Sequence, residues 1–112
     1  MGRWRDEWET AGYRADLGSG VDFIRVRIQV ERGEVIRYTA QQEADVGDQT
    51  LAMLRYDSAH GRPHRDLLDW CGAVIEKRWV PASTMSAALT EAIVDIRANW
   101  PTYRDDFERR RR

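Results

Sequence analysis

Residues 21–31, VDFIRVRIQVE, decide the fold of this chain. Apolar residues occupy every second position of the stretch, at Ile24, Val26, Ile28 and Val30. A period of two is typical of a β-strand with one buried side and one side in water. The stretch therefore predicts a strand in a sheet that is covered on one face only.

The residues that follow extend this strand into an antiparallel meander. Gly33, directly after Arg32, favours a tight turn, because glycine tolerates a positive φ. Further turns are predicted at residues 46–48 and 71–72. The remaining strands are predicted over residues 34–44, 50–57, 67–70 and 73–80, which gives about five strands within residues 21–80.

The hydrophobic period changes after residue 80. Apolar residues are then spaced by three and four, which predicts one helix over residues 83–99 with Ser83 or Thr84 as its N-cap. Pro101 is expected to end this helix, because the residue before a proline avoids the α region. Residues 101–112 then form a short helix and a basic tail. Residues 1–18 fit either a short helix or an extended arm. The apolar positions of the predicted helix are Met85, Ala88, Leu89, Ala92, Ile93 and Ile96.

Together these elements predict a single α+β domain over residues 1–112. Its antiparallel β-meander of about five strands is covered by one main C-terminal helix, because one apolar sheet face needs a cover. The other sheet face would be plain solvent-facing sheet, a basic platform for a polyanion, or a dimer interface. We expect it to carry Arg25, Arg27, Arg37 and Arg55.

Composition narrows the classes of function. The 112 residues carry a net charge of −1, so overall charge gives no argument for nucleic acid. The apolar runs are too short to span a membrane, and the first residues are charged. The single cysteine, Cys71, cannot form an internal disulfide. We therefore expect a cytoplasmic protein with no membrane partner, and, since no cofactor-binding motif is present, no cofactor.

The candidate site is the segment RYDSAHGRPHR, residues 55–65. It holds both histidines of the chain together with three arginines. One hypothesis is metal-independent cleavage of RNA, in which histidine supplies the acid and the base and arginine binds phosphate. His60 and His64 would be acid and base in either order, Tyr56 would orient them or replace one, and Asp57 would fix an imidazole tautomer. The phosphate-binding residues would be Arg55, Arg62 and Arg65.

Two other interpretations of this segment stay open. Asp57, His60 and His64 have a spacing that a facial metal site tolerates. Alternatively, the histidines only satisfy backbone groups in a long loop, and the protein is a non-enzymatic binding module, with a homodimer through a sheet edge or face as one form of it.

At Arg55-Tyr56-Asp57, Ala59-His60-Gly61 and Pro63-His64-Arg65 the chain resembles a small prokaryotic family of unknown function related to the TumE-like toxins of toxin–antitoxin pairs. The resemblance covers about residues 21–100. It implies a toxin-like activity directed at RNA and a cognate antitoxin protein as partner.

Overall fold

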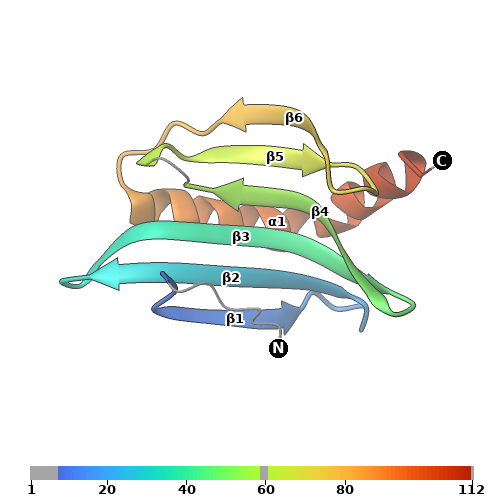
Figure 1. Ribbon diagram of the computed structural model, residues 1–112, viewed down its shortest axis with the longest axis horizontal. Helices are drawn as coiled ribbons and strands as arrows, with labels where there is room; N and C mark the ends of the chain where they lie inside the picture. Colours follow the sequence, from blue (N-terminus) through green and yellow to red (C-terminus); the bar gives the residue numbers. More distant parts are fainter. Residues whose placement is uncertain (1–7, 59–60, 112) are drawn as a thin grey trace.

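The computed structural model describes residues 8–58 and 61–111. Its strands form one antiparallel sheet in sequence order, so each strand pairs with its neighbours along the chain. Helix α1 crosses one face of this sheet and packs mainly on β3 and β4 (Figure 1). The elements are β1 (Ala11–Asp16), β2 (Asp22–Glu31), β3 (Glu34–Val46), β4 (Gln49–Asp57), β5 (His64–Leu68), β6 (Val74–Trp79) and α1 (Met85–Arg109).

The alternation in β2 sets the two faces of the sheet, as predicted. Ile24 and Val26 are fully buried beneath α1, whereas Arg25 and Arg27, between and after them, face the other way and stay partly exposed. Arg32 and Gly33 both have positive φ, 52° and 78°, and close a two-residue hairpin into β3. The α+β class, the meander and the covering helix are confirmed.

The sheet has six strands instead of five. The additional strand is β1, which lies within the ambiguous segment 1–18 and pairs with β2. In its sequence, AGYRAD, the alternate residues Ala11, Tyr13 and Ala15 are only weakly apolar, so its extended form depends on pairing with β2. In the same way β5 begins at His64, three residues before the predicted start, because the segment pairs with both β4 and β6.

Helix α1 begins where the sequence predicts and ends later. The Thr84 side chain accepts a hydrogen bond from the Ala87 N–H at 3.0 Å, which caps the first turn. The predicted end near residue 99 is wrong, since α1 runs through Pro101 to Arg109. Contacts beyond the proline explain the continuation. Phe107 is 1% exposed and stacks on Trp70 with 4.6 Å between ring centroids, and the Trp70 Nε1–H donates to the Phe107 carbonyl at 2.8 Å.

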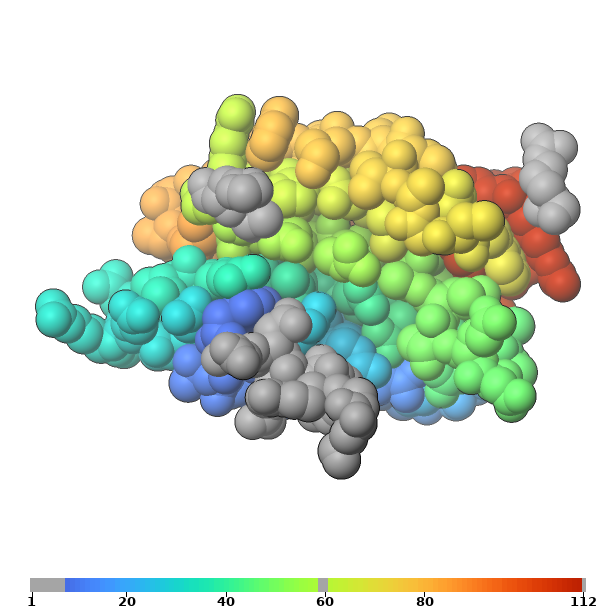
Figure 2. All heavy atoms as spheres, viewed as in Figure 1, coloured from blue at the N-terminus to red at the C-terminus, as the bar shows by residue number. Residues whose placement is uncertain are grey.

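The face of the sheet opposite α1 is called the open face below. Figure 2 looks onto it, with the helix behind the sheet. The molecule measures 44 × 35 × 25 Å, so the sheet offers a long and shallow surface. Within residues 8–58 and 61–111, no helix has both the length and the hydrophobicity that crossing a membrane requires.

Candidate functional site

A row of polar side chains crosses the open face from one edge of the sheet to the other. Strand pairing aligns one residue from each strand, and residues directly opposite each other share a face. A second row lies two residues further along each strand. The first row is Arg14, Arg25, Gln41, Arg55, Asp66 and Lys77, and the second is Arg27, Thr39, Asp57, His64 and Trp79.

Glu43 neutralises one end of the first row. Its side chain is fully buried and accepts hydrogen bonds from Arg14 Nε at 2.7 Å and Arg25 Nη2 at 2.9 Å. Burial alone would raise the pKa of Glu43, but the donors Arg25, Gln41 and Arg14 outweigh it and hold the pKa below its ordinary value. Arg14 and Arg25 are therefore already ion-paired within the protein, and their charges stabilise the fold.

Three other arginines on this face have no carboxylate partner within the described residues. Arg55 Nε donates to the neutral Gln41 Oε1 at 2.8 Å. The guanidinium of Arg62 lies over the Trp79 ring at 4.0 Å, and that of Arg37 lies over the Trp8 ring at 4.2 Å. A guanidinium held by an aromatic ring or a neutral amide keeps its charge available to a phosphate.

His64 lies in the second row, at the start of β5. Its side chain is only 7% exposed, with Nε2 3.4 Å from Asp66 Oδ2. Nδ1 is 3.2 Å from the Arg62 carbonyl oxygen, and the ring meets the Trp79 ring edge-on at 5.6 Å. Asp57 is directly opposite His64 in the β4–β5 pairing. The imidazole is thus fixed in orientation by its neighbours and offers little surface to solvent.

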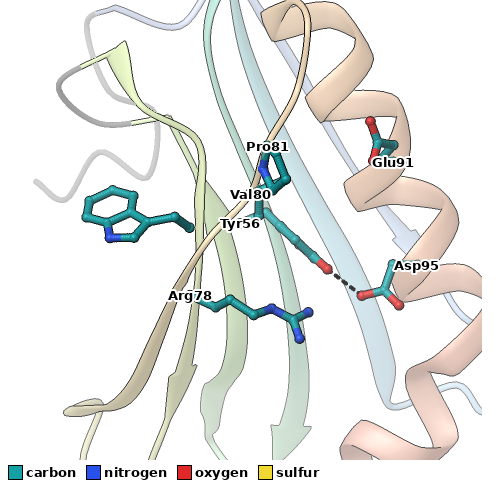
Figure 3. Close-up of a pocket in the computed structure, with 7 residues that line it drawn as sticks. Tyr56, Arg78, Val80, Pro81, Glu91 and Asp95 are labelled. Atoms are coloured by element: carbon teal, nitrogen blue, oxygen red, sulfur yellow. Dashed lines mark hydrogen bonds between the residues drawn. The ribbon is translucent and has the colours of Figure 1, made fainter.

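Tyr56 and Arg65 lie on the other face of the sheet, beneath α1. The Tyr56 hydroxyl donates to Asp95 Oδ2 at 2.5 Å, and the Tyr103 hydroxyl donates to the same oxygen at 2.6 Å (Figure 3 shows the bond from Tyr56). Asn99 donates to the second carboxylate oxygen at 2.7 Å. Arg65 contacts the Tyr103 hydroxyl at 3.5 Å. This network joins the sheet to the helix.

The pKa values in this network follow from burial and these short bonds. Burial and the hydrogen bond to Asp95 raise the pKa of Tyr56 above its ordinary value. Burial would also raise the pKa of Asp95, but the hydroxyls of Tyr103 and Tyr56 overcome that effect, and the pKa of this carboxyl is lowered. Asp95 is therefore an anion, and Tyr56 is a neutral donor at neutral pH.

A pocket of about 320 Å³ opens beside this network, between β6 and α1. Arg78 extends from β6 toward Tyr56 and Asp95 (Figure 3). Two carboxylates and one guanidinium line it, and Asp95 already has three donors. The Asp95 carboxylate is thus already used in the network that joins the sheet to the helix. The lining residues are Tyr56, Arg78, Trp79, Val80, Pro81, Glu91 and Asp95.

The structure divides the site residues that the sequence predicts. Arg55, Asp57, Arg62 and His64 share the open face, whereas Tyr56 and Arg65 lie beneath the helix, where Tyr56 is too deeply engaged with Asp95 to orient a histidine on the other face. His60 lies outside the described residues, and with it the two-histidine arrangement and the alternative metal set of Asp57, His60 and His64. No three His, Cys, Asp or Glu side chains elsewhere in the described segments are grouped as a metal site requires.

Sequence reasoning missed Asp95 and the position of Trp79 beside His64. Asp95, Asn99 and Tyr103 repeat every fourth residue and so share one helix face, a spacing that predicts their contact once the helix is extended past Pro101. Trp79 is directly opposite His64 in the β5–β6 pairing. That position depends on the register of the two strands.

Comparison with known proteins gives one match. No curated protein and no solved structure matches the chain. Residues 5–112 match the family described as a domain of unknown function, DUF7718. This match spans both the sheet with its open face and the helix that clamps it, and the chain belongs to the DUF7718 family.

Proposed function

We propose that this protein is a toxin-like RNA-directed protein that binds single-stranded RNA on the open face of its sheet. One observation carries the proposal. Arg37, Arg55 and Arg62 have no carboxylate partner within the described residues, and they lie on a sheet face that no helix covers. An antiparallel sheet face with free cations and accessible rings is a common platform for single strands.

The aromatic rings add a way to bind bases. Trp79 is 48% exposed beside Arg62, and Trp8 is partly exposed beside Arg37. A base that stacks on an indole contributes about 1–3 kcal/mol by alanine substitution, and the neighbouring guanidinium can bind the adjoining phosphate. Because each base presents a similar ring face, such binding is tolerant of sequence.

Local charge explains how a chain with a net charge of −1 can bind a polyanion. Two of the acidic groups on the open face, Glu43 and Asp66, are already paired. Glu43 binds Arg14 and Arg25, and Asp66 lies 3.2 Å from Lys77 Nζ and 3.4 Å from His64 Nε2. The guanidinium charges of Arg55 and Arg62 would attract phosphates over about 10 Å at moderate salt.

Salt-dependent binding tests this proposal. The anisotropy of a fluorescein-labelled, unstructured 12-nucleotide RNA is measured between 50 and 200 mM salt. Each arginine that neutralises one phosphate of a single strand contributes about 0.7 to the slope of log K against log salt. We expect Arg55→Ala and Arg62→Ala each to lower the slope by about that amount. Arg97→Ala is the matched control, because Arg97 is exposed on α1 and carries the same charge on the opposite side.

Equal slopes for Arg55→Ala, Arg97→Ala and the unaltered protein would refute binding at the open face. So would tighter binding to duplex than to single-stranded RNA, because a shallow sheet face with stacking rings suits unpaired bases. The cognate antitoxin that the resemblance implies is expected to compete with the RNA for this surface.

We further propose that the protein cleaves the RNA that it binds. A base would take the proton of a ribose 2′-hydroxyl, the 2′-oxygen would attack phosphorus, and the 5′-oxygen would leave with a proton from an acid. The products carry a 2′,3′-cyclic phosphate and a 5′-hydroxyl. His64, which lies 3.2 Å from the Arg62 carbonyl oxygen and directly opposite Asp57 in the β4–β5 pairing, is our candidate for one of the two proton-transfer groups.

Mass spectrometry of the RNA ends tests the cleavage step. We expect a cyclic phosphate end with the unaltered protein and its loss with His64→Gln, while circular dichroism shows the fold retained. A protein that binds the RNA with the predicted salt slope and releases no such product has a binding function only.

A further inference from the structure

We infer that β6 is the contact surface for a second copy of this chain, which pairs with it antiparallel about a two-fold axis at Lys77 and joins two sheets into one. The inference starts from the edges of the sheet. β1 and β6 are its two edge strands, and all six residues of β6 are exposed. Val74, Ile75 and Trp79 are large apolar side chains that are 48–49% exposed. An edge with such side chains and unpaired backbone groups is a template for another strand.

The backbone of β6 has its hydrogen-bonding groups in the orientation that this pairing needs. The Val80 N–H donates to the Pro63 carbonyl at 3.0 Å. The backbone hydrogen-bonding groups of Val80 therefore point toward the β5 side. Alternation then directs the backbone groups of Lys77 and Trp79 outward. Two copies of Lys77 that face each other can therefore exchange both of their N–H···O bonds.

The charged side chains that flank Lys77 complement each other in this register. A two-fold axis perpendicular to the sheet must keep residues of the same face opposite each other, so it passes through a residue position. With the axis at Lys77, Glu76 lies opposite Arg78 of the second copy, and Trp79 lies opposite position 75 of the second copy, an isoleucine. With the axis one residue earlier or later, Glu76 or Arg78 would face its own copy, and the pairing of Glu76 with Arg78 would be lost.

Both charged partners are available for this contact. Arg78 is exposed and has no hydrogen-bond or carboxylate partner within the described residues. Glu76 uses Oε1 for Arg65 at 3.0 Å, which leaves Oε2 for a second donor. The two Lys77 ammonium groups face each other, and the Asp66 carboxylate, 3.2 Å from Lys77 Nζ in each copy, offsets their repulsion.

A cysteine placed on the axis gives the sharpest test. Hydrogen-bonded antiparallel pairs have Cα atoms about 5.5 Å apart, within the range that a disulfide spans. In a Cys71→Ser background, which removes the exposed native thiol, Lys77→Cys is expected to form a disulfide-linked dimer on mild oxidation. Ile75→Cys is the matched control, because its two copies would be four positions, about 13 Å, apart along the strands.

Sedimentation of the unoxidised proteins provides a second readout. Arg78→Glu turns two attractive pairs into repulsive ones and is expected to weaken the dimer about tenfold or more. The double exchange of Glu76→Arg with Arg78→Glu restores opposite charges across the axis and is expected to recover much of the association. These assays contain no RNA and leave Arg37, Arg55 and Arg62 unchanged. A negative result would therefore overturn the dimer without bearing on the proposed RNA binding.

Selective linkage through position 77, together with weakening by Arg78→Glu, would support the β6 pairing. A protein that stays monomeric at about 100 µM, or that links as readily through position 75 as through position 77, would overturn it.

Discussion

The hydrogen bond from Tyr56 to Asp95 should be a main stabilising contact between sheet and helix. Tyr56→Phe removes only the hydroxyl, which donates to Asp95 Oδ2 at 2.5 Å and joins β4 to α1. A hydrogen bond to a charged group contributes about 1.5–3 kcal/mol. Tyr103 and Asn99 still donate to the carboxylate after the substitution. We therefore expect the lower part of that range, a loss of about 2 kcal/mol in the free energy of unfolding.

Urea unfolding followed by tryptophan fluorescence measures this loss. The midpoint should fall while the m-value stays unchanged, and the melting temperature should drop by about 8 °C for a domain of this size. Tyr13→Phe is the matched control, because Tyr13 is 40% exposed on the edge strand β1, and its loss should stay below about 0.5 kcal/mol. If the two variants unfold at the same urea concentration, the hydrogen bond from Tyr56 to Asp95 does not stabilise the fold, and the reasoning is refuted.

Two further predictions concern stability. Pro101→Ala restores a helical N–H and should raise the free energy of unfolding by about 1–3 kcal/mol in the same assay; an unchanged or lowered midpoint would contradict this. Glu43→Gln leaves Arg14 and Arg25 without their shared buried carboxylate and should cost about 3 kcal/mol at pH 7. Because the folded pKa of Glu43 lies below its ordinary 4.5, its contribution is present above pH 4.5 and is lost as the pH falls through the folded value. The Glu43→Gln protein should therefore lose less stability on acidification, and parallel pH profiles would disprove that.

Local patterns were enough to predict most of the fold. The alternation in β2, the turn at Arg32-Gly33 and the apolar stripe of α1 each act over a few residues, so their meaning is visible in the sequence. The errors involve contacts between separate elements. β1 is extended because β2 pairs with it, and α1 continues past Pro101 because Phe107 stacks on Trp70.

The candidate site was harder to predict for the same reason. Arg55 was placed correctly on the open face, because strand alternation separates it from Tyr56 on β4. The assignment of Arg65 to the phosphate-binding set required a loop at 64–66, but pairing with β4 and β6 makes that segment a strand and turns Arg65 under the helix. The contact of Trp79 with Arg62 depends on strand register, which the sequence pattern leaves open.

Binding of single-stranded RNA at the open face is the central claim, and arginine side-chain NMR tests it most directly. The Nε–Hε resonances of ¹⁵N-labelled protein are followed while an unstructured oligoribonucleotide is added. We predict shifts at Arg37, Arg55 and Arg62, with Arg97 and Arg104 on the helix unchanged. Shifts confined to the helix arginines, or no shifts at millimolar RNA in low salt, would contradict the claim.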